Sequence, residues 1–180
     1  MKKICLLFVI LCLGLPVQAA ENQVTYKVDN ALYEGFFIRP APGAPLVILI
    51  HDWDGLGAYE IRRAHMLADQ GYAVFAADMF GKGIRPEQIA ERRRLTGELY
   101  QDRDRMRRLL QGALDAAETQ GGDLKNAVAL EQHGVAHEMI TYGGAPHAFS
   151  VFGTDRYRED ADQKSWQRFL NYLDQTLAGR

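Results

Sequence analysis

The chain has 180 residues, of which 47% are hydrophobic and 24% are charged, with 23 acidic side chains against 21 basic ones. This is the composition of an ordinary globular protein, and it excludes collagen-like, low-complexity and fully disordered chains. The length predicts one domain, and the near balance of charge argues against a nucleic-acid partner.

The first 20 residues have the three parts of a secretory leader. Residues 1–3 are basic, residues 4–15 form an apolar run, and residues 16–20 end in small side chains. The apolar run is too short to span a bilayer, so we expect no membrane association after leader removal. We therefore expect residues 1–20 to be cleaved on export to the periplasm or the medium, leaving residues 21–180 as one domain. Both cysteines lie in the leader, so the mature chain should have no disulfide and no cysteine nucleophile.

The first half of the mature chain predicts a β-hairpin and then a strand, a helix and a second strand. The hairpin strands alternate about the turn Asp29-Asn30, and the next strand is a continuous apolar run that should be buried on both faces. The helix ends at Gly71, where a left-handed cap belongs. The order strand, helix, strand predicts a parallel crossover and the α/β class. These elements are expected over residues 24–28 and 32–39 (hairpin), 46–50 (strand), 58–70 (helix) and 72–77 (strand).

The second half is predicted to be largely helical. A long arginine-rich helical region should end at Gly121-Gly122, and the acidic residues interleaved with its arginines favour a solvated face of ion pairs over a polyanion site. A third parallel strand and a loop should precede the last helix. The expected elements are residues 86–120 (helical), 124–133 (short helix), 137–142 (strand) and about 162–177 (helix).

The segment 51–57 is the first candidate site, because loops after parallel strands carry the sites of open α/β sheets. Its backbone N–H groups lie near a helix N-terminus and suit a developing oxyanion; a plain polar turn is the alternative. A dinucleotide site is disfavoured, since Gly55-x-Gly57 is followed by Glu60 in place of a third glycine. A calcium loop is disfavoured by the spacing of its acidic residues.

Histidines supply the second candidate site. His147 lies on the glycine-rich loop 143–149, where an imidazole could transfer protons near neutral pH; a structural histidine is the alternative. His133 and His137 are four residues apart, but a glycine between them makes a shared metal improbable. We interpret His65, in the middle of a helix, as structural.

Several motifs together resemble the dienelactone hydrolases of the α/β-hydrolase superfamily. They are Leu32-Tyr33-Glu34-Gly35-Phe36-Phe37-Ile38-Arg39-Pro40, His51-Asp52-x-x-Gly55-Leu56, residues 68–81, Tyr142-Gly143-Gly144-Ala145-x-His147-Ala148-Phe149 and Ser165-Trp166. The resemblance implies an abbreviated α/β-hydrolase-type, mostly parallel sheet with an N-terminal β-hairpin and flanking helices. It also implies hydrolysis of a small ester or lactone through an acyl-enzyme, without cofactor or metal. His147 would then be the triad base, the Trp53 backbone N–H an oxyanion donor, and Asp52 the acidic residue beside the nucleophile position.

The chain departs from the family where the nucleophile belongs. A G-x-nucleophile-x-G elbow should follow the long helix, yet Gly121-Gly122 leads directly into residues 123–127, and the strand with the triad aspartate is also absent. The domain is thus internally shortened near residues 121–124, by roughly 60–90 residues at ~30 per strand–helix unit. Ser150 is a weak candidate for the nucleophile. The alternatives are a catalytically silent or internally deleted family member, at most a small-molecule binding module, and a chain that does not fold stably because strands 46–50 and 137–142 lose their neighbours.

Overall fold

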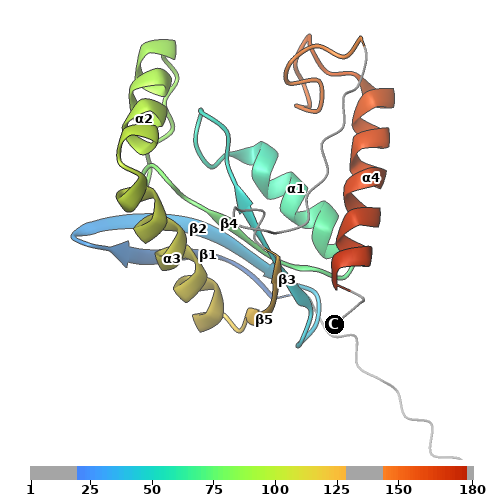
Figure 1. The fold of residues 1–180 in the computed structure, drawn as a ribbon, viewed down its shortest axis with the longest axis horizontal. Coiled ribbons are helices and arrows are strands. Elements are labelled where there is room, and N and C mark those ends of the chain that lie inside the picture. Colours follow the sequence, from blue (N-terminus) through green and yellow to red (C-terminus); the bar gives the residue numbers. More distant parts are fainter. Residues whose placement is uncertain (1–19, 129–143, 178–180) are drawn as a thin grey trace, which may run out of the picture.

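The computed structural model describes residues 20–128 and 144–177. Five strands form one sheet in the order β1-β2-β4-β3-β5, with α1 and α4 on one face and α2 and α3 toward the other (Figure 1). Residues 1–19 of the predicted leader lie outside the described part, as do His133, His137 and the predicted strand 137–142. None of the helices in the described ranges has the length and apolar character needed to cross a bilayer.

The predicted N-terminal hairpin is confirmed. Strands β1 (Ala20–Val28) and β2 (Ala31–Arg39) pair antiparallel, and Asp29 in the turn adopts a left-handed φ of 53°. Strand β1 lies at the edge of the sheet, while β2 continues antiparallel onto β4. The hairpin therefore extends one side of the sheet.

The predicted strand–helix–strand crossover is confirmed as well. Strands β3 (Pro45–Ile50) and β4 (Ala73–Ala77) pair in parallel and are joined by helix α1 (Ala58–Ala68). Gly71 follows the helix at φ +94°, a conformation that glycine adopts without a steric penalty. The parallel strands, the antiparallel hairpin and the flanking helices together give the expected fold class, a partial α/β-hydrolase-type sheet.

The long helical region consists of two helices, α2 (Ile89–Gln101) and α3 (Arg103–Thr119). Helix α3 lies against the hairpin so closely that a Cβ added at Gly112 would overlap the side chain of Val28. The predicted last helix is α4 (Glu159–Leu177).

The predicted helix over residues 124–133 is wrong for its first part. Residues Asp123–Val128 form strand β5, which pairs in parallel with the outer side of β3. Gly121, at φ +87°, ends the α3 region, and the chain then meets an open edge of β3 whose N–H and C=O groups need partners. This demand outweighs the weak local helix preference, and it gives β3 a neighbour on each side within the described sheet.

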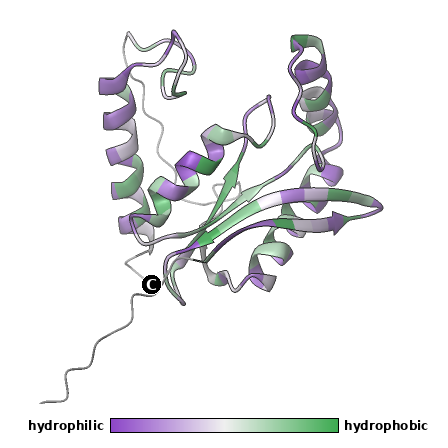
Figure 2. Ribbon diagram, turned by 180° about the vertical axis from the view of Figure 1, so that it is seen from behind, coloured by the Kyte–Doolittle hydropathy of each residue, from purple (hydrophilic) through white to green (hydrophobic). Residues whose placement is uncertain are grey.

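The core has two layers because successive strand residues face opposite sides of the sheet. Strand residues on one face pack against α3, and those on the other face pack against α1 and α4. The central strands β3 and β4 are accordingly coloured largely as hydrophobic in Figure 2, whereas the edge strand β1 is mostly hydrophilic. The α3 side contains Phe37, Leu46, Phe75, Leu109 and Ala113; the other side contains Phe36, Ile38, Val47, Val74, Leu67 and Leu173.

Strand β3 was predicted to be buried on both faces, and the structure confirms this only at the beginning of the strand. Leu46 and Val47 are buried, whereas Ile50 at the carboxyl end is 52% exposed. The expectation of a fully buried strand is thus wrong at this end. The open end of β3 is where the candidate site lies.

Candidate functional site

His51 fixes the loop after β3 to the end of β4. Its Nε2 accepts the backbone N–H of Met79 at 3.0 Å, so the ring hydrogen is on Nδ1, which donates to the Asp52 carbonyl at 2.6 Å. The ring is buried and meets the Phe80 ring edge-on, with 4.6 Å between the two centroids. His51 is therefore a structural imidazole with both nitrogens engaged.

The predicted oxyanion donor and the predicted acidic residue bond to each other. The Trp53 backbone N–H donates to Asp52 Oδ1 at 2.6 Å. A carboxylate acceptor makes this a strong, charge-assisted hydrogen bond. An oxyanion could use the Trp53 N–H only after the Asp52 carboxylate has moved away.

Glu60 caps the helix that follows this loop. Its Oε2 accepts the Gly57 backbone N–H at 2.8 Å, and the side chain is buried. Desolvation by burial raises the pKa of Glu60. Glu60 is at the position where a dinucleotide-binding motif has its third glycine. Its carboxylate accepts the hydrogen bond from the Gly57 N–H, which would otherwise be available to a phosphate. The arrangement agrees with the prediction against a dinucleotide site.

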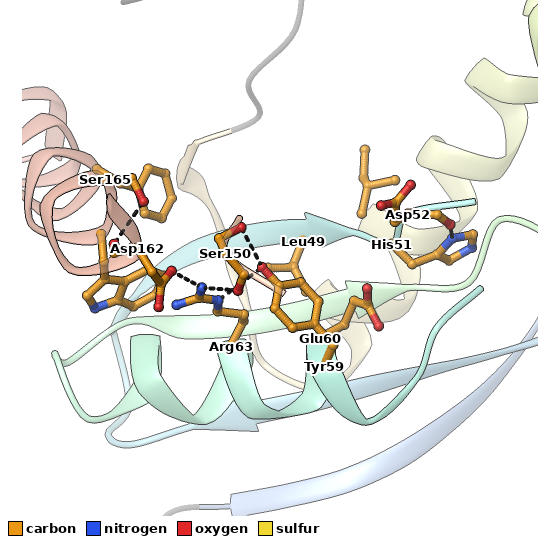
Figure 3. Close-up of a pocket in the computed structure, with 12 residues that line it drawn as sticks. Leu49, His51, Asp52, Tyr59, Glu60, Arg63, Ser150, Asp162 and Ser165 are labelled. Carbon is orange, nitrogen blue, oxygen red and sulfur yellow. Dashed lines mark hydrogen bonds and ion pairs between the residues drawn. The ribbon is translucent and has the colours of Figure 1, made fainter. Parts of the chain in front are cut away.

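A cavity of about 460 Å³ lies at the carboxyl end of β3, between α1 and α4 (Figure 3). Its walls come from β3 and the following loop, from α1, from the loop after His147, and from α4. Both serines of the chain, Ser150 and Ser165, line it. The other lining residues are Leu49, Ile50, His51, Asp52, Tyr59, Glu60, Arg63, Asp162, Trp166 and Phe169.

One wall of this cavity is a buried ion pair between Arg63 of α1 and Asp162 of α4. The Arg63 guanidinium also donates to the Ser150 carbonyl at 2.9 Å, and lies 4.4 Å from the Phe152 ring centroid and 5.0 Å from that of Trp166. We call these residues, together with Tyr59, the Arg63 cluster. The cluster ties the loop of Ser150 to two helices, as Figure 3 shows.

The hydroxyls of the two serines have different partners. Ser150 Oγ lies 3.3 Å from the Tyr59 hydroxyl, which in turn accepts a hydrogen bond from Arg63 Nε. Ser165 Oγ donates to the Asp162 carbonyl at 2.8 Å within α4. Neither described hydroxyl contacts a histidine.

His147 is exposed on the loop that leads to Ser150. The loop reverses direction through a hydrogen bond from the Phe149 N–H to the Pro146 carbonyl and through Ala148, at φ +66°. In the described part of the chain the His147 ring has no hydrogen-bond partner. In Figure 3 Asp52 lies beside His51 and apart from Ser150, which lies next to Tyr59 and Arg63. The sequence-predicted residues thus lie around one sheet edge, but they are not joined into a triad here.

The remaining expectations concern charge and metals. Ion pairs such as Arg94–Glu98 at 2.6 Å and Arg107–Asp104 at 2.7 Å confirm the solvated face of ion pairs on α2 and α3. His65 is half-exposed and lies 3.7 Å from Glu21. Across residues 20–128 and 144–177, no three His, Cys, Asp or Glu side chains gather as metal ligands would.

Sequence reasoning missed the Arg63 cluster. A signal did exist, because Glu60, Arg63, Ala64 and Leu67 follow helical spacing and are all buried, so two charged residues interrupt an apolar stripe. Charged side chains in such positions need a partner. The partner, Asp162, is 99 residues away in the sequence.

The parallel strands, the crossover and the cavity at the strand ends define an α/β-hydrolase-type domain. A family model described as the dienelactone hydrolase family matches residues 33–130 and 122–177, and the chain belongs to this family. The two matched segments overlap at residues 122–130, close to the position where the sequence predicts an internal shortening.

Solved structures agree with this family. A protein named m3DLH is similar with 26% identity and a TM-score of 0.57, and the dienelactone hydrolase-like promiscuous phosphotriesterase P91 from metagenomic libraries with 29% identity and a TM-score of 0.56. Each match covers 61% of this chain and 47% of the other, so the chain spans about half the length of these relatives. A Klebsiella pneumoniae protein named as a candidate dienelactone hydrolase shares the fold, with 14% identity, a TM-score of 0.65, and coverage of 88% of this chain and 99% of its own. A comparison with curated protein sequences finds no match.

Proposed function

We propose that the chain hydrolyses a small ester or lactone in the cavity at the carboxyl end of β3. Membership of the dienelactone hydrolase family supports this reaction class. The choice of site depends on the position of Ser150. This residue lines the cavity of about 460 Å³ and follows His147 by three positions in the same loop. Ser150 is the nucleophile of this proposal, and His147 is its base.

Ser150 suits this role better than Ser165 because its hydroxyl is less firmly held. The 3.3 Å separation from the Tyr59 hydroxyl exceeds the ordinary 2.7–2.8 Å of an O–H···O bond, whereas Ser165 donates at 2.8 Å to a carbonyl of its own helix. A weakly held hydroxyl can change partner at small cost. His147, with no partner among the described residues, is free to become that partner.

In the proposed reaction Ser150 Oγ attacks the ester carbonyl while its proton passes to His147. His147 then protonates the departing alkoxide, leaving an acyl ester on Ser150 that a water molecule hydrolyses with His147 again acting as base. The Trp53 N–H donates to the oxyanion after Asp52 has released it. Since Asp52 and Ser150 lie apart in Figure 3, the reaction requires the loop of His147 and Ser150 to move toward Trp53.

Hydrolysis of p-nitrophenyl acetate and of dienelactone by the purified protein tests this proposal. Ser150→Ala and His147→Ala should each lower kcat/KM by about 100-fold or more. Ser165→Ala is the matched control, because it removes the other cavity serine, and it should leave kcat/KM within about threefold. Equal rates for all three variants and the unmodified protein would contradict the assignment.

Two observations favour a second candidate, a family member that binds small esters or lactones without turnover. Asp52 holds the N–H of Trp53, and Tyr59 is the hydrogen-bond partner of Ser150. Loss of one member of a catalytic triad typically costs several orders of magnitude in rate. Saturable binding of a substrate without hydrolysis above the background rate would support this candidate over the first.

We propose further that the protein is exported to the periplasm or secreted, as a single domain over residues 21–180. The basic, apolar and small-residue segments of the first 20 residues support this. Fusing these residues to an enzyme that is active only after export tests the proposal. A fusion that stays in the cytoplasm and therefore shows no activity would contradict it.

A further inference from the structure

A second cavity, of about 250 Å³, lies on the other side of the β3 end, between the sheet edge and helices α2 and α3. It shares Ile50, His51 and Asp52 with the cavity of Ser150. We call it the apolar cavity, because most of its other walls are aliphatic or aromatic. They are Trp53, Met79, Phe80, Thr96, Leu99, Tyr100, Met106 and Leu110.

The rim of the apolar cavity exposes large apolar side chains to water. Ile50 is 52% exposed, Trp53 38% and Tyr100 63%, and the three come from different elements around one opening. Covering such side chains removes apolar surface from water and is favourable at roughly 25 cal/mol per Å². A ligand that enters here gains affinity by apolar contact.

The charges around the apolar cavity set the kind of ligand. No lysine or arginine is among its described lining residues, and Nε2 of His51 accepts the backbone N–H of Met79, so this ring nitrogen has no hydrogen to donate to an anion. Two arginines stack on rim aromatics, Arg92 on Trp53 at 5.5 Å and Arg103 on Tyr100 at 5.2 Å, but neither lines the cavity. Within the described lining, the Asp52 carboxylate is the one charged group. An anion placed inside would lose hydration, gain no cation and face a like charge.

We propose that the apolar cavity binds the uncharged aryl or alkyl part of a small ester and disfavours anionic ligands. That the ligand is an ester rests on the proposed function, because the cavity itself indicates only that its ligand is neutral and apolar. It predicts that neutral esters bind better than lactones or esters that carry a carboxylate. Asp52 is the residue that sets this selectivity.

Acetanilide, an uncharged and stable relative of phenyl acetate, and 4-acetamidobenzoate, the same molecule with a carboxylate, are the probes. Quenching of Trp53 fluorescence, measured in a Trp166→Phe background, gives the affinity for each probe. We expect the ratio of the affinity for acetanilide to the affinity for 4-acetamidobenzoate to be at least ten. Asp52→Asn should narrow this ratio about fivefold, as one unit charge at about 4 Å in water is worth about 1 kcal/mol. Asp54→Asn is the matched control, since Asp54 is in the same loop but outside the apolar cavity, and it should leave the ratio unchanged.

Three results would overturn the inference. They are equal affinity for the two probes, binding that is unaffected by Leu99→Glu, and concentration-dependent self-association that buries Ile50 and Tyr100 in place of a ligand. The same titrations in Ser150→Ala separate this inference from the proposed function. If the protein hydrolyses no ester but still binds acetanilide more tightly than 4-acetamidobenzoate, the inference about the apolar cavity stands and the proposed hydrolysis fails. If it hydrolyses esters but binds the two probes equally, the inference about the apolar cavity fails and the proposed hydrolysis stands.

Discussion

Arg63→Met tests whether the Arg63 cluster holds the site together. The substitution keeps a long apolar side chain against Phe152 and Trp166 but leaves Asp162 buried without its cation. Among the described residues, the Tyr157 hydroxyl, at 3.2 Å, would be the one group that still donates to the Asp162 side chain. Breaking a buried ion pair by removing one partner costs about 3–5 kcal/mol. We expect a loss of that size in the free energy of unfolding, a large part of the 5–15 kcal/mol typical of domains.

Arg62→Met is the matched control for this experiment. Arg62 directly precedes Arg63, is exposed, and lies 4.0 Å from the centroid of the same Phe152 ring, but it makes no ion pair among the described residues. Its loss should cost about 0.5–1 kcal/mol, the value of an exposed cation–π contact. Urea denaturation with unchanged m-values measures both variants on one scale.

One further measurement separates the buried charge from a simple packing defect. Adding Asp162→Leu to Arg63→Met should recover much of the lost stability, because the orphaned charge is removed. Equal losses for Arg62→Met and Arg63→Met, or a double variant as unstable as the single one, would refute the reasoning.

Three other predictions concern stability. Gly112→Ala should destabilise the protein by about 1–2 kcal/mol because its Cβ meets Val28, while Gly97→Ala in open space on α2 should stabilise it by up to about 1 kcal/mol; equal shifts in Tm would contradict this. Thr96→Val should be neutral or stabilise by about 1 kcal/mol, since its hydroxyl is buried and has no partner in the described part of the chain; a clear drop in the urea midpoint would show a missed partner. Burial raises the pKa of Glu60 above 4.5, so the unmodified protein should lose stability relative to Glu60→Gln as pH rises through 4.5; a pH-independent difference would be contrary to this.

The hairpin, the crossover and the helices could be predicted because their signals are local. Alternating side chains about Asp29-Asn30 and the glycine at position 71 each determine a turn within a few residues. Strand β5 was beyond such reasoning, since residues 123–128 become a strand through pairing with a β3 edge about 80 residues earlier.

The sequence predicted which residues lie at the candidate site, but not the hydrogen bonds and ion pairs between them. The positions of Asp52, Trp53, Ser150 and His147 near one sheet edge follow from the order of elements and from the family resemblance. The bond from the Trp53 N–H to Asp52 depends on a loop conformation that the sequence does not specify. The pairing of Arg63 with Asp162 depends on how α4 packs against α1, which a single sequence does not reveal.

Labelling with a fluorophosphonate probe, followed by peptide mapping, tests the proposed hydrolysis most directly. Such a probe forms a covalent bond only with a serine that is activated as a nucleophile. We predict one adduct per chain, on Ser150, that is lost in Ser150→Ala and His147→Ala and retained in Ser165→Ala. A folded protein that takes up no label, or takes it up elsewhere, would contradict Ser150 as the nucleophile.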